Sequence, residues 1–205
     1  MKENIKINCH SSICINDKIY FDPFQIHEKR NNAEVIFITH SHFDHLDVES
    51  INNIRNDKTK IVCTNDSAKI LRENKIPNDL YVIKPFDSGK ADNIEFKTFP
   101  SYNSHHLKKM GFVGYTAKID GVTYTVCGDT DATKELEEVK TDILLIPIGG
   151  FYTMDAVEAA KVTNIIKPKL VIPTHYNFIS GTATKEAEKD FIKNVDKEIE
   201  VKILI

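Results

Sequence analysis

A seven-residue stretch, Thr39-His40-Ser41-His42-Phe43-Asp44-His45, follows directly on the apolar run Val35-Ile36-Phe37-Ile38. The short, largely β-branched run predicts a buried central strand. Three imidazoles and a carboxylate thus stand at the C-terminal end of a strand, where proteins commonly mount chemistry. Because these are metal-ligand side chains, a metal site explains the stretch better than a histidine-rich loop without a ligand.

The spacing within this stretch suggests two ions. If the chain stays extended, the side chains of His40 and His42 project to the same side and can grip one metal. Asp44 and His45 are adjacent, so they leave the backbone in different directions. Once the chain turns towards the following helix, they can serve a second metal close to the first.

Other metal-ligand types occur further along the chain. The polar loop 101–111 carries His105 and His106, Asp129 follows a predicted hairpin, and His175 follows the apolar run Leu170-Val171-Ile172. Asp129 has a plain alternative role as a helix cap. One ligand from the loop brings the set to seven, which suits two ions with open positions. The seven are His40, His42, Asp44, His45, one of His105 and His106, Asp129, and His175.

Three further residues have less specific interpretations. Asp22, at another predicted strand end, either orients a metal-bound histidine or forms a turn, and the pattern favours neither. His10, between two predicted strands, is expected to be a hydrogen-bonded structural histidine more readily than a ligand. His27 stands among charged residues and is expected to be solvated.

Composition limits the classes of function. A chain of 205 residues with 41% apolar residues can bury one substantial core, so we expect a single domain over residues 1–205. The net charge is −3, the pI is near 6.2 and arginines occur only at 30, 55 and 72, which argues against a nucleic-acid surface. The sequence leaves open whether the chain forms a homo-oligomer.

The chain shows no targeting pattern. Residues 1–6 lack the apolar region of a signal peptide, and no apolar run is long enough to span a bilayer. We therefore expect a cytoplasmic protein without a membrane partner. The cysteines at 9, 14, 63 and 127 form no C-x-x-C pair, so free buried thiols are expected rather than disulfides or a zinc ribbon.

Periodicity and turn signals predict an α/β fold. Short strands over residues 5–9, 12–15 and 18–21 form a meander, and strands then alternate with helices near 48–54, 67–73, 134–138 and 155–166. Asp120-Gly121 marks a two-residue hairpin turn between residues 112–119 and 122–127, and Asp87-Ser88-Gly89 predicts a turn between strands over 80–83 and 94–99. A closing strand is expected over 201–205, after a segment with Thr184 as the N-cap.

The HxHxDH motif, followed by a histidine, by Gly128-Asp129-Thr130 and by Pro173-Thr174-His175-Tyr176, resembles the metallo-β-lactamase-fold hydrolase superfamily. Within it the chain is similar to the small prokaryotic hydrolases related to L-ascorbate-6-phosphate lactonase. The resemblance implies an αββα sandwich, with His40, His42 and the loop histidine on one metal. Asp44, His45 and His175 would hold the other, and Asp129 would bridge. The resemblance also favours His106 over His105, because relatives carry the loop histidine at the matching distance before the strand that here reads Val113-Gly114-Tyr115. If the loop stays extended, Lys108 would then point towards the site.

These assignments predict a dinuclear hydrolase in which a metal-bridging hydroxide cleaves an ester, lactone or phosphodiester. Two cations, two aspartates and a hydroxide leave about one net positive charge, which favours a small anionic substrate. Asp44 is expected to orient the hydroxide and to accept the proton that the water loses when the hydroxide forms, and Tyr152 or the following helix N-terminus to bind the developing oxyanion. Zinc is the first expectation for the metal, with manganese or iron as alternatives. The competing hypotheses are a nuclease and a non-catalytic metal-binding domain.

Overall fold

The structure is a computed structural model that describes residues 4–205, so residues 1–3 of the opening segment lie outside it. The chain divides into two compact units. The first covers Met1–Lys84 with Lys90–Asn93, and the second covers Pro85–Gly89 with Ile94–Ile205. Each unit is described by itself. The expectation of one domain over the whole chain stays a prediction.

The first unit is built on a six-stranded sheet in the order β1-β2-β3-β4-β5-β6. Its strands are β1 Ile5–Cys9, β2 Ser12–Ile15, β3 Ile19–Phe21, β4 Val35–Ile38, β5 Lys60–Thr64 and β6 Leu80–Ile83. The first three pair antiparallel as the predicted meander, and β3 to β6 pair parallel. Because β3 and β4 are parallel, their C-terminal ends share one edge of the sheet.

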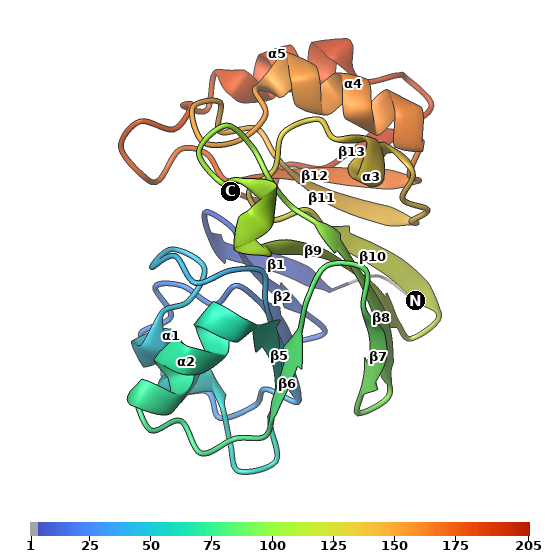
Figure 1. The fold of residues 1–205 in the computed structure, drawn as a ribbon. Helices are drawn as coiled ribbons and strands as arrows, with labels where there is room; N and C mark the ends of the chain where they lie inside the picture. The colour runs from blue at the N-terminus through green and yellow to red at the C-terminus, as the bar shows by residue number, and fades with distance from the viewer. Residues whose placement is uncertain (1–3) are drawn as a thin grey trace. The chain divides into compact units, whose positions relative to one another are not determined.

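Two helices pack on this sheet, α1 Val48–Ile54 and α2 Asn65–Glu73, and α2 lies against β5 and β6 (Figure 1). Asp47 caps α1 and Thr64 caps α2 through their side-chain oxygens, which satisfies backbone N–H groups of each first turn. The core between helices and sheet is aliphatic and contains Ile36, Ile38, Ile51, Ile54, Ile61 and Leu71. This packing fixes β4, whose four residues are all buried.

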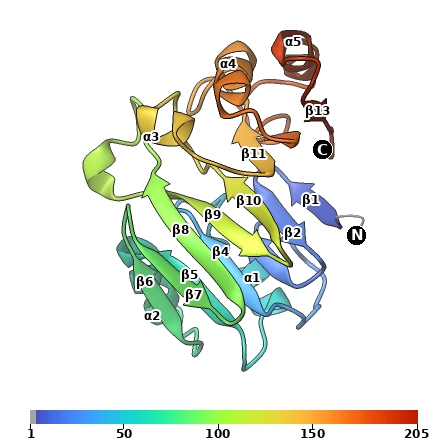
Figure 2. The ribbon, with the colours of Figure 1, turned by 90° about the vertical axis from the view of Figure 1, so that its right-hand side faces the viewer.

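A seven-stranded sheet in the order β13-β12-β11-β10-β9-β8-β7 belongs to the second unit, apart from Lys90 and Ala91 at the end of β7, which belong to the first unit (Figure 2). Its strands are β7 Ser88–Ala91, β8 Ile94–Pro100, β9 Val113–Ile119, β10 Val122–Val126, β11 Ile143–Pro147, β12 Leu170–Thr174 and β13 Glu200–Val201. Strands β8, β9 and β10 pair antiparallel, and β10 to β13 pair parallel. The C-terminal ends of β10 and β12 therefore lie at the same sheet edge.

The helices of this unit are α3 Lys134–Glu137, α4 Ala156–Ile166 and α5 Ala187–Asn194. Asp155 and Glu158 form a capping box at the start of α4. The small residues Ala156, Ala159 and Ala160 of α4 are buried in the core with Leu144, Ile146, Val171 and Phe191. Small side chains there let the helix approach strand β11 closely.

The α/β class predicted from the sequence is confirmed, but four local expectations are wrong. The closing strand is only β13, and Ser88-Gly89, expected as turn, belongs to strand β7. Part of loop 101–111 curls into a 3₁₀ turn, η1 Lys108–Met110. Thr184 is not the N-cap of α5, because the cap position falls on Glu186. Within residues 4–205, the helices are all too short or too polar to cross a bilayer.

Candidate metal centre

Strand β4 delivers the HxHxDH motif to the sheet edge. His40 and His45 are fully buried, Asp44 is 7% exposed and His42 is half-buried. After His42 the chain turns at once, since the N–H groups of His45 and Leu46 both donate to the His42 carbonyl at 3.0 and 2.8 Å. The turn brings the His45 ring to 4.0 Å from the His40 ring, centroid to centroid, and His42 lies 4.7 Å from His40.

Asp22 follows β3 at the same edge and holds this motif in place. Its carboxylate accepts hydrogen bonds from the Thr39 backbone N–H, the Thr39 hydroxyl and Nδ1 of His45, each at 2.7 Å. Burial raises the pKa of the Asp22 carboxyl, while His45 and Thr39 oppose that rise. Of the two roles left open by the sequence, the contacts match the one that orients a histidine.

The same network selects the tautomers of two histidines. Thr39 donates its only hydroxyl hydrogen to Asp22, so its oxygen accepts from Nδ1 of His40 at 2.9 Å. Nδ1 of His45 donates to Asp22. With Nδ1 protonated, each ring carries its lone pair on Nε2, which is the form that binds a metal.

The second unit positions Asp129 and His175 together. Asp129 follows β10 and His175 follows β12, and the parallel pairing of both strands with β11 places them at one edge. Both are nearly fully buried, and Nε2 of His175 lies 3.0 Å from Oδ1 of Asp129. Gly149 lets its own loop lie against the backbone of His175, because a Cβ at position 149 would lie only 2.2 Å from the His175 carbonyl oxygen.

The two loop histidines differ in their surroundings. His106 is buried, and its Nδ1 lies 4.0 Å from Oδ2 of Asp129. His105 is exposed and packs its ring beside Phe151 and Tyr152 at 5.0 and 5.3 Å. His106 thus lies near Asp129, another predicted ligand, and its own role as a ligand stays a prediction.

Asn103 is a residue that sequence reasoning missed. Its side-chain oxygen accepts from the backbone N–H groups of His105 and His106 at 2.7 Å. Its amide donates to the carbonyls of Asp129 and Tyr152 at 3.1 and 2.6 Å. Asn103 therefore ties the histidine loop to the Asp129 loop. An asparagine two residues before a histidine pair is a turn-forming signal, but that signal does not indicate partners across the chain such as Asp129 and Tyr152.

Two other predicted contributors lie at the surface of the second unit. Tyr152 is 37% exposed and stacks edge-on against Phe151. Lys108, expected to point towards the site if its loop stayed extended, instead pairs with Glu135 and lies over the Tyr102 ring at 5.0 Å. The reason is the 3₁₀ turn, which rotates Lys108 away from the direction that an extended chain would give.

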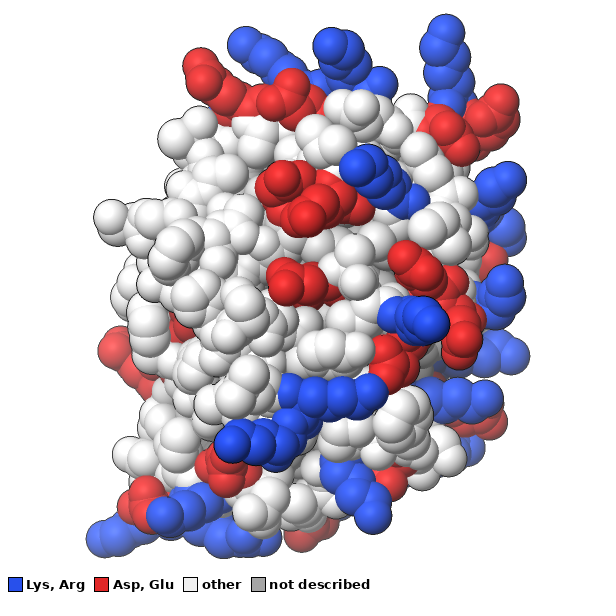
Figure 3. Space-filling model, turned by 45° about the horizontal axis from the view of Figure 1, so that its top comes forward, with Lys and Arg blue, Asp and Glu red and all other residues white. Residues whose placement is uncertain are grey.

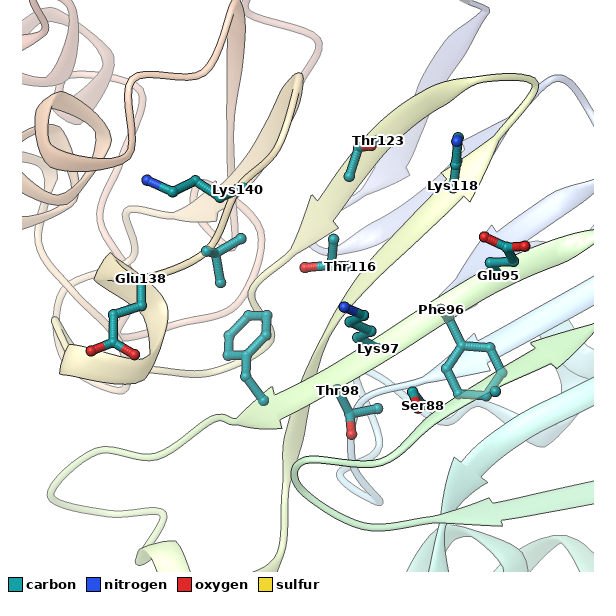
Figure 4. Close-up of a pocket in the computed structure, with 13 residues that line it drawn as sticks. Ser88, Glu95, Phe96, Lys97, Thr98, Thr116, Lys118, Thr123, Glu138 and Lys140 are labelled. Atoms are coloured by element: carbon teal, nitrogen blue, oxygen red, sulfur yellow. The ribbon is translucent and has the colours of Figure 1, made fainter.

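A separate groove of about 710 Å³ lies on the face of β8 to β10 in the second unit (Figure 4). Lys97, Thr116 and Thr123 line its floor, and Glu138 and Lys140 lie across from them. None of the residues that line it is a predicted metal ligand. Its volume alone therefore gives no reason to place the chemistry there.

The residues present fit divalent metal ions. Each unit offers buried imidazole and carboxylate groups in close clusters, and such donors suit zinc, manganese or iron. Thiolate ligation is not needed. Burial raises the pKa of the Cys127 thiol, and the four cysteines of the chain, all described in the structure, are free. Cys127 is thus a poor nucleophile despite its position two residues before Asp129.

Comparison with known proteins identifies the class. The β-lactamase superfamily domain matches residues 5–175, and the chain belongs to this family. Within it, the chain is similar to the metal-dependent hydrolases of Thermococcus onnurineus and Pyrococcus furiosus, with 33% identity to each. The matches cover 84% and 91% of this chain and 79% and 88% of those proteins. The chain is thus a member of the metal-dependent hydrolase family of this superfamily.

Solved structures agree with this assignment. A candidate metal-dependent hydrolase from Parabacteroides distasonis is 26% identical, with a TM-score of 0.78 over 98% of this chain and 92% of that one. Igni18, a metallo hydrolase from Ignicoccus hospitalis, has a TM-score of 0.77 at 20% identity over 98% and 94%. The predicted metallo-β-lactamase fold is confirmed. The closer link to L-ascorbate-6-phosphate lactonase stays a prediction.

Proposed function

We propose that this chain is a dinuclear metal-dependent hydrolase that cleaves an ester, lactone or phosphodiester bond in a small anionic substrate. The observation that carries the proposal is the network of Asp22 and Thr39, which presents Nε2 of His40 and His45 as metal donors. Two histidines with a purely structural role would not both have to be protonated on Nδ1 with Nε2 left as an acceptor. The pairing of His175 with Asp129 supplies matching donors in the second unit.

Seven residues would hold the ions in this proposal. In this proposal His40, His42 and His106 would hold one ion, Asp44, His45 and His175 would hold the other, and Asp129 would contribute to both. When bound, two divalent ions lower the pKa of a water molecule and polarise the bond to be cleaved. Asp44 orients the attacking water and accepts its proton, and the Tyr152 hydroxyl binds the charge that develops on the substrate.

The charge balance favours an anion as substrate. Two divalent ions bring four positive charges, while Asp44 and Asp129 contribute two negative charges and an attacking hydroxide one more. The site thus keeps a net positive charge that attracts a carboxylate or phosphate. A neutral substrate is attracted less strongly, because it carries no net charge for the positive site to stabilise.

The surface charges favour a small substrate over a nucleic acid. Several lysines are paired with acidic neighbours, among them Lys18 with Glu34, Lys60 with Asp79 and Lys169 with Asp142. On the face shown in Figure 3, acidic side chains are interspersed among the basic ones. A polyanion is held by a basic stripe instead, and its binding weakens steeply with salt.

A substrate panel tests this proposal. Protein purified, stripped with a chelator and reloaded with zinc, manganese or iron is assayed against generic esters, lactones, phosphodiesters and short RNA. We expect metal-dependent turnover of at least one small anionic ester, lactone or diester, and no salt-sensitive tight binding of RNA. Tight metal binding with no turnover across the panel would favour a non-catalytic domain, and RNA cleavage would favour a nuclease.

A further inference from the structure

His10 lies at the sheet edge that carries the metal-binding motif. It occupies the two-residue turn between β1 and β2, where Cys9 pairs with Ser12. Strand β2 runs antiparallel to β3, with Ile13 opposite Phe21. The β1–β2 turn therefore lies at the C-terminal end of β3, on the same edge as the end of β4.

Two properties of His10 are unusual for a hairpin turn. Turn residues are normally exposed, but His10 is 0% exposed. Its φ is +51°, a left-handed conformation that glycine or asparagine adopts more readily in two-residue turns. A large imidazole in this place, fully buried, indicates a role beyond turning the chain.

The ring of His10 points at the predicted ligands of one ion. Its Nε2 lies 3.3 Å from Oδ2 of Asp44, and Nε2 of His45 lies 3.5 Å from the same oxygen. The ligand atoms offered by the three residues all lie within 4.8 Å of one another. Donors bound tetrahedrally at about 2.05 Å from a zinc ion are separated by about 3.3 Å. The measured distances are those of neighbouring ligands on one ion.

We propose that His10 is itself a metal ligand, binding through Nε2 the same ion as Asp44 and His45. This ion would then have one imidazole donor in addition to those of His45 and His175. The inference rests on the proposed function, because it assumes that the chain binds divalent ions. It assigns a function to a histidine that the sequence pattern had marked as structural.

Variants of His10 test the proposal through metal binding rather than activity. Wild type, His10→Ala, His10→Gln and the control His27→Ala are stripped with a chelator and titrated with Co²⁺ alone, reading ions per chain and visible absorption. Glutamine keeps an N–H that can donate to Asp44 but is a poor ligand for cobalt or zinc. His27 has a side chain that is 72% exposed, so its loss should change nothing.

We expect both His10 variants to bind one cobalt ion more weakly by at least about 100-fold, beyond the usual effect of losing an orienting residue. The visible absorption spectrum of that bound cobalt ion should change as well. Wild-type affinity and spectrum in His10→Gln would overturn the proposal, since they would assign His10 to hydrogen bonding alone. If wild type itself binds no cobalt, the proposed function fails instead.

A measurement on the wild type guards against a variant that does not fold. Protein labelled with ¹⁵N in its histidine rings is loaded with Co²⁺, and hyperfine-shifted ring signals are assigned. Direct ligation predicts that the His10 ring is among the strongly shifted signals, as His45 is, while the His27 ring is not. A His10 ring without contact shift would contradict ligation whatever the variants do.

Discussion

At the scale of single residues, Asp22 shows how a buried carboxylate prepares a metal site. It accepts three hydrogen bonds of 2.7 Å and is fully buried. In Asp22→Asn, the amide N–H₂ would face donors instead of accepting from them. We expect metal affinity to fall by roughly 10–100-fold and the protein to unfold at lower temperature.

Metal titration and thermal unfolding measure these two effects. The matched control is Asp17→Asn, where the carboxylate is exposed and pairs with Lys6. Surface pairs of this kind contribute little, so the control should behave like wild type. An Asp22→Asn variant with wild-type metal affinity would show that the Asp22 network does not prepare the histidines.

The histidine pair in the loop gives a second prediction at this scale. His106 is buried near Asp129, whereas His105 is exposed beside Phe151 and Tyr152. We expect His106→Ala to lose one metal donor and to lower kcat/KM by about 100-fold or more, and His105→Ala to have a mild effect. The metal content and the kinetics of the two variants decide which of the two histidines is the ligand. Loss of metal in His105→Ala alone would reverse the assignment.

At the scale of elements, close packing between loops places His175. A Cβ on Gly149 would meet the His175 carbonyl oxygen at 2.2 Å, so one of the two loops must move in Gly149→Ala. We expect a loss of about 1–3 kcal/mol in unfolding free energy, together with weaker metal binding. Urea unfolding and metal titration measure both.

Gly121→Asn provides the control for Gly149. Gly121 has a φ of +86°, and a Cβ there has open space around it. Asparagine tolerates the left-handed conformation better than other side chains do, so the loss of stability should be smaller than in Gly149→Ala. Equal destabilisation by the two substitutions would mean that the crowding at His175 is not the cause.

The strands of the second unit are also joined by a charged contact. Asp142 accepts from the Thr123 N–H at 3.0 Å and pairs with Lys169 at 2.8 Å, and these contacts lower its pKa. A carboxyl whose pKa is lower in the folded state than in the unfolded state stabilises the folded protein. This stabilisation is fully present above the unfolded pKa, near 4, and is lost as the pH falls through the folded pKa. The side chain is 31% exposed, so the effect should stay below about 1 kcal/mol.

Urea unfolding at pH 7, 5 and 3 tests this. Asp142→Asn should be slightly less stable than wild type at pH 7 and 5, and the difference should shrink by pH 3. Asp57→Asn, in the loop before β5, serves as the control. A difference that grows towards pH 3 would contradict the sign of the pKa shift.

Local patterns predicted most of the elements because strand ends and ligand types coincide in sequence. Val35–Ile38 gave a buried strand, and the motif after it lies at the edge of the sheet as expected. The roles of His10 and Asn103 escaped because each depends on pairing across the chain. Only the antiparallel register of β2 with β3 places the His10 turn beside Asp44. Lys108 was misplaced for a local reason, the 3₁₀ turn.

At the scale of the whole molecule, family membership and two ligand clusters agree on metal-dependent hydrolysis. The family match covers residues 5–175, which includes all seven predicted ligands. The cluster of the first unit depends on the Asp22 network, and that of the second on the edge shared by β10 and β12. The central claim is that the chain uses both clusters to bind two ions.

Metal analysis of the intact chain tests that claim most directly. Protein is stripped with a chelator, saturated with Zn²⁺, freed of excess metal and measured by elemental analysis against protein concentration. The proposed site predicts about two zinc ions per chain, falling to about one when His45 is replaced by alanine. A saturated wild-type chain that holds one ion or none would contradict the dinuclear account.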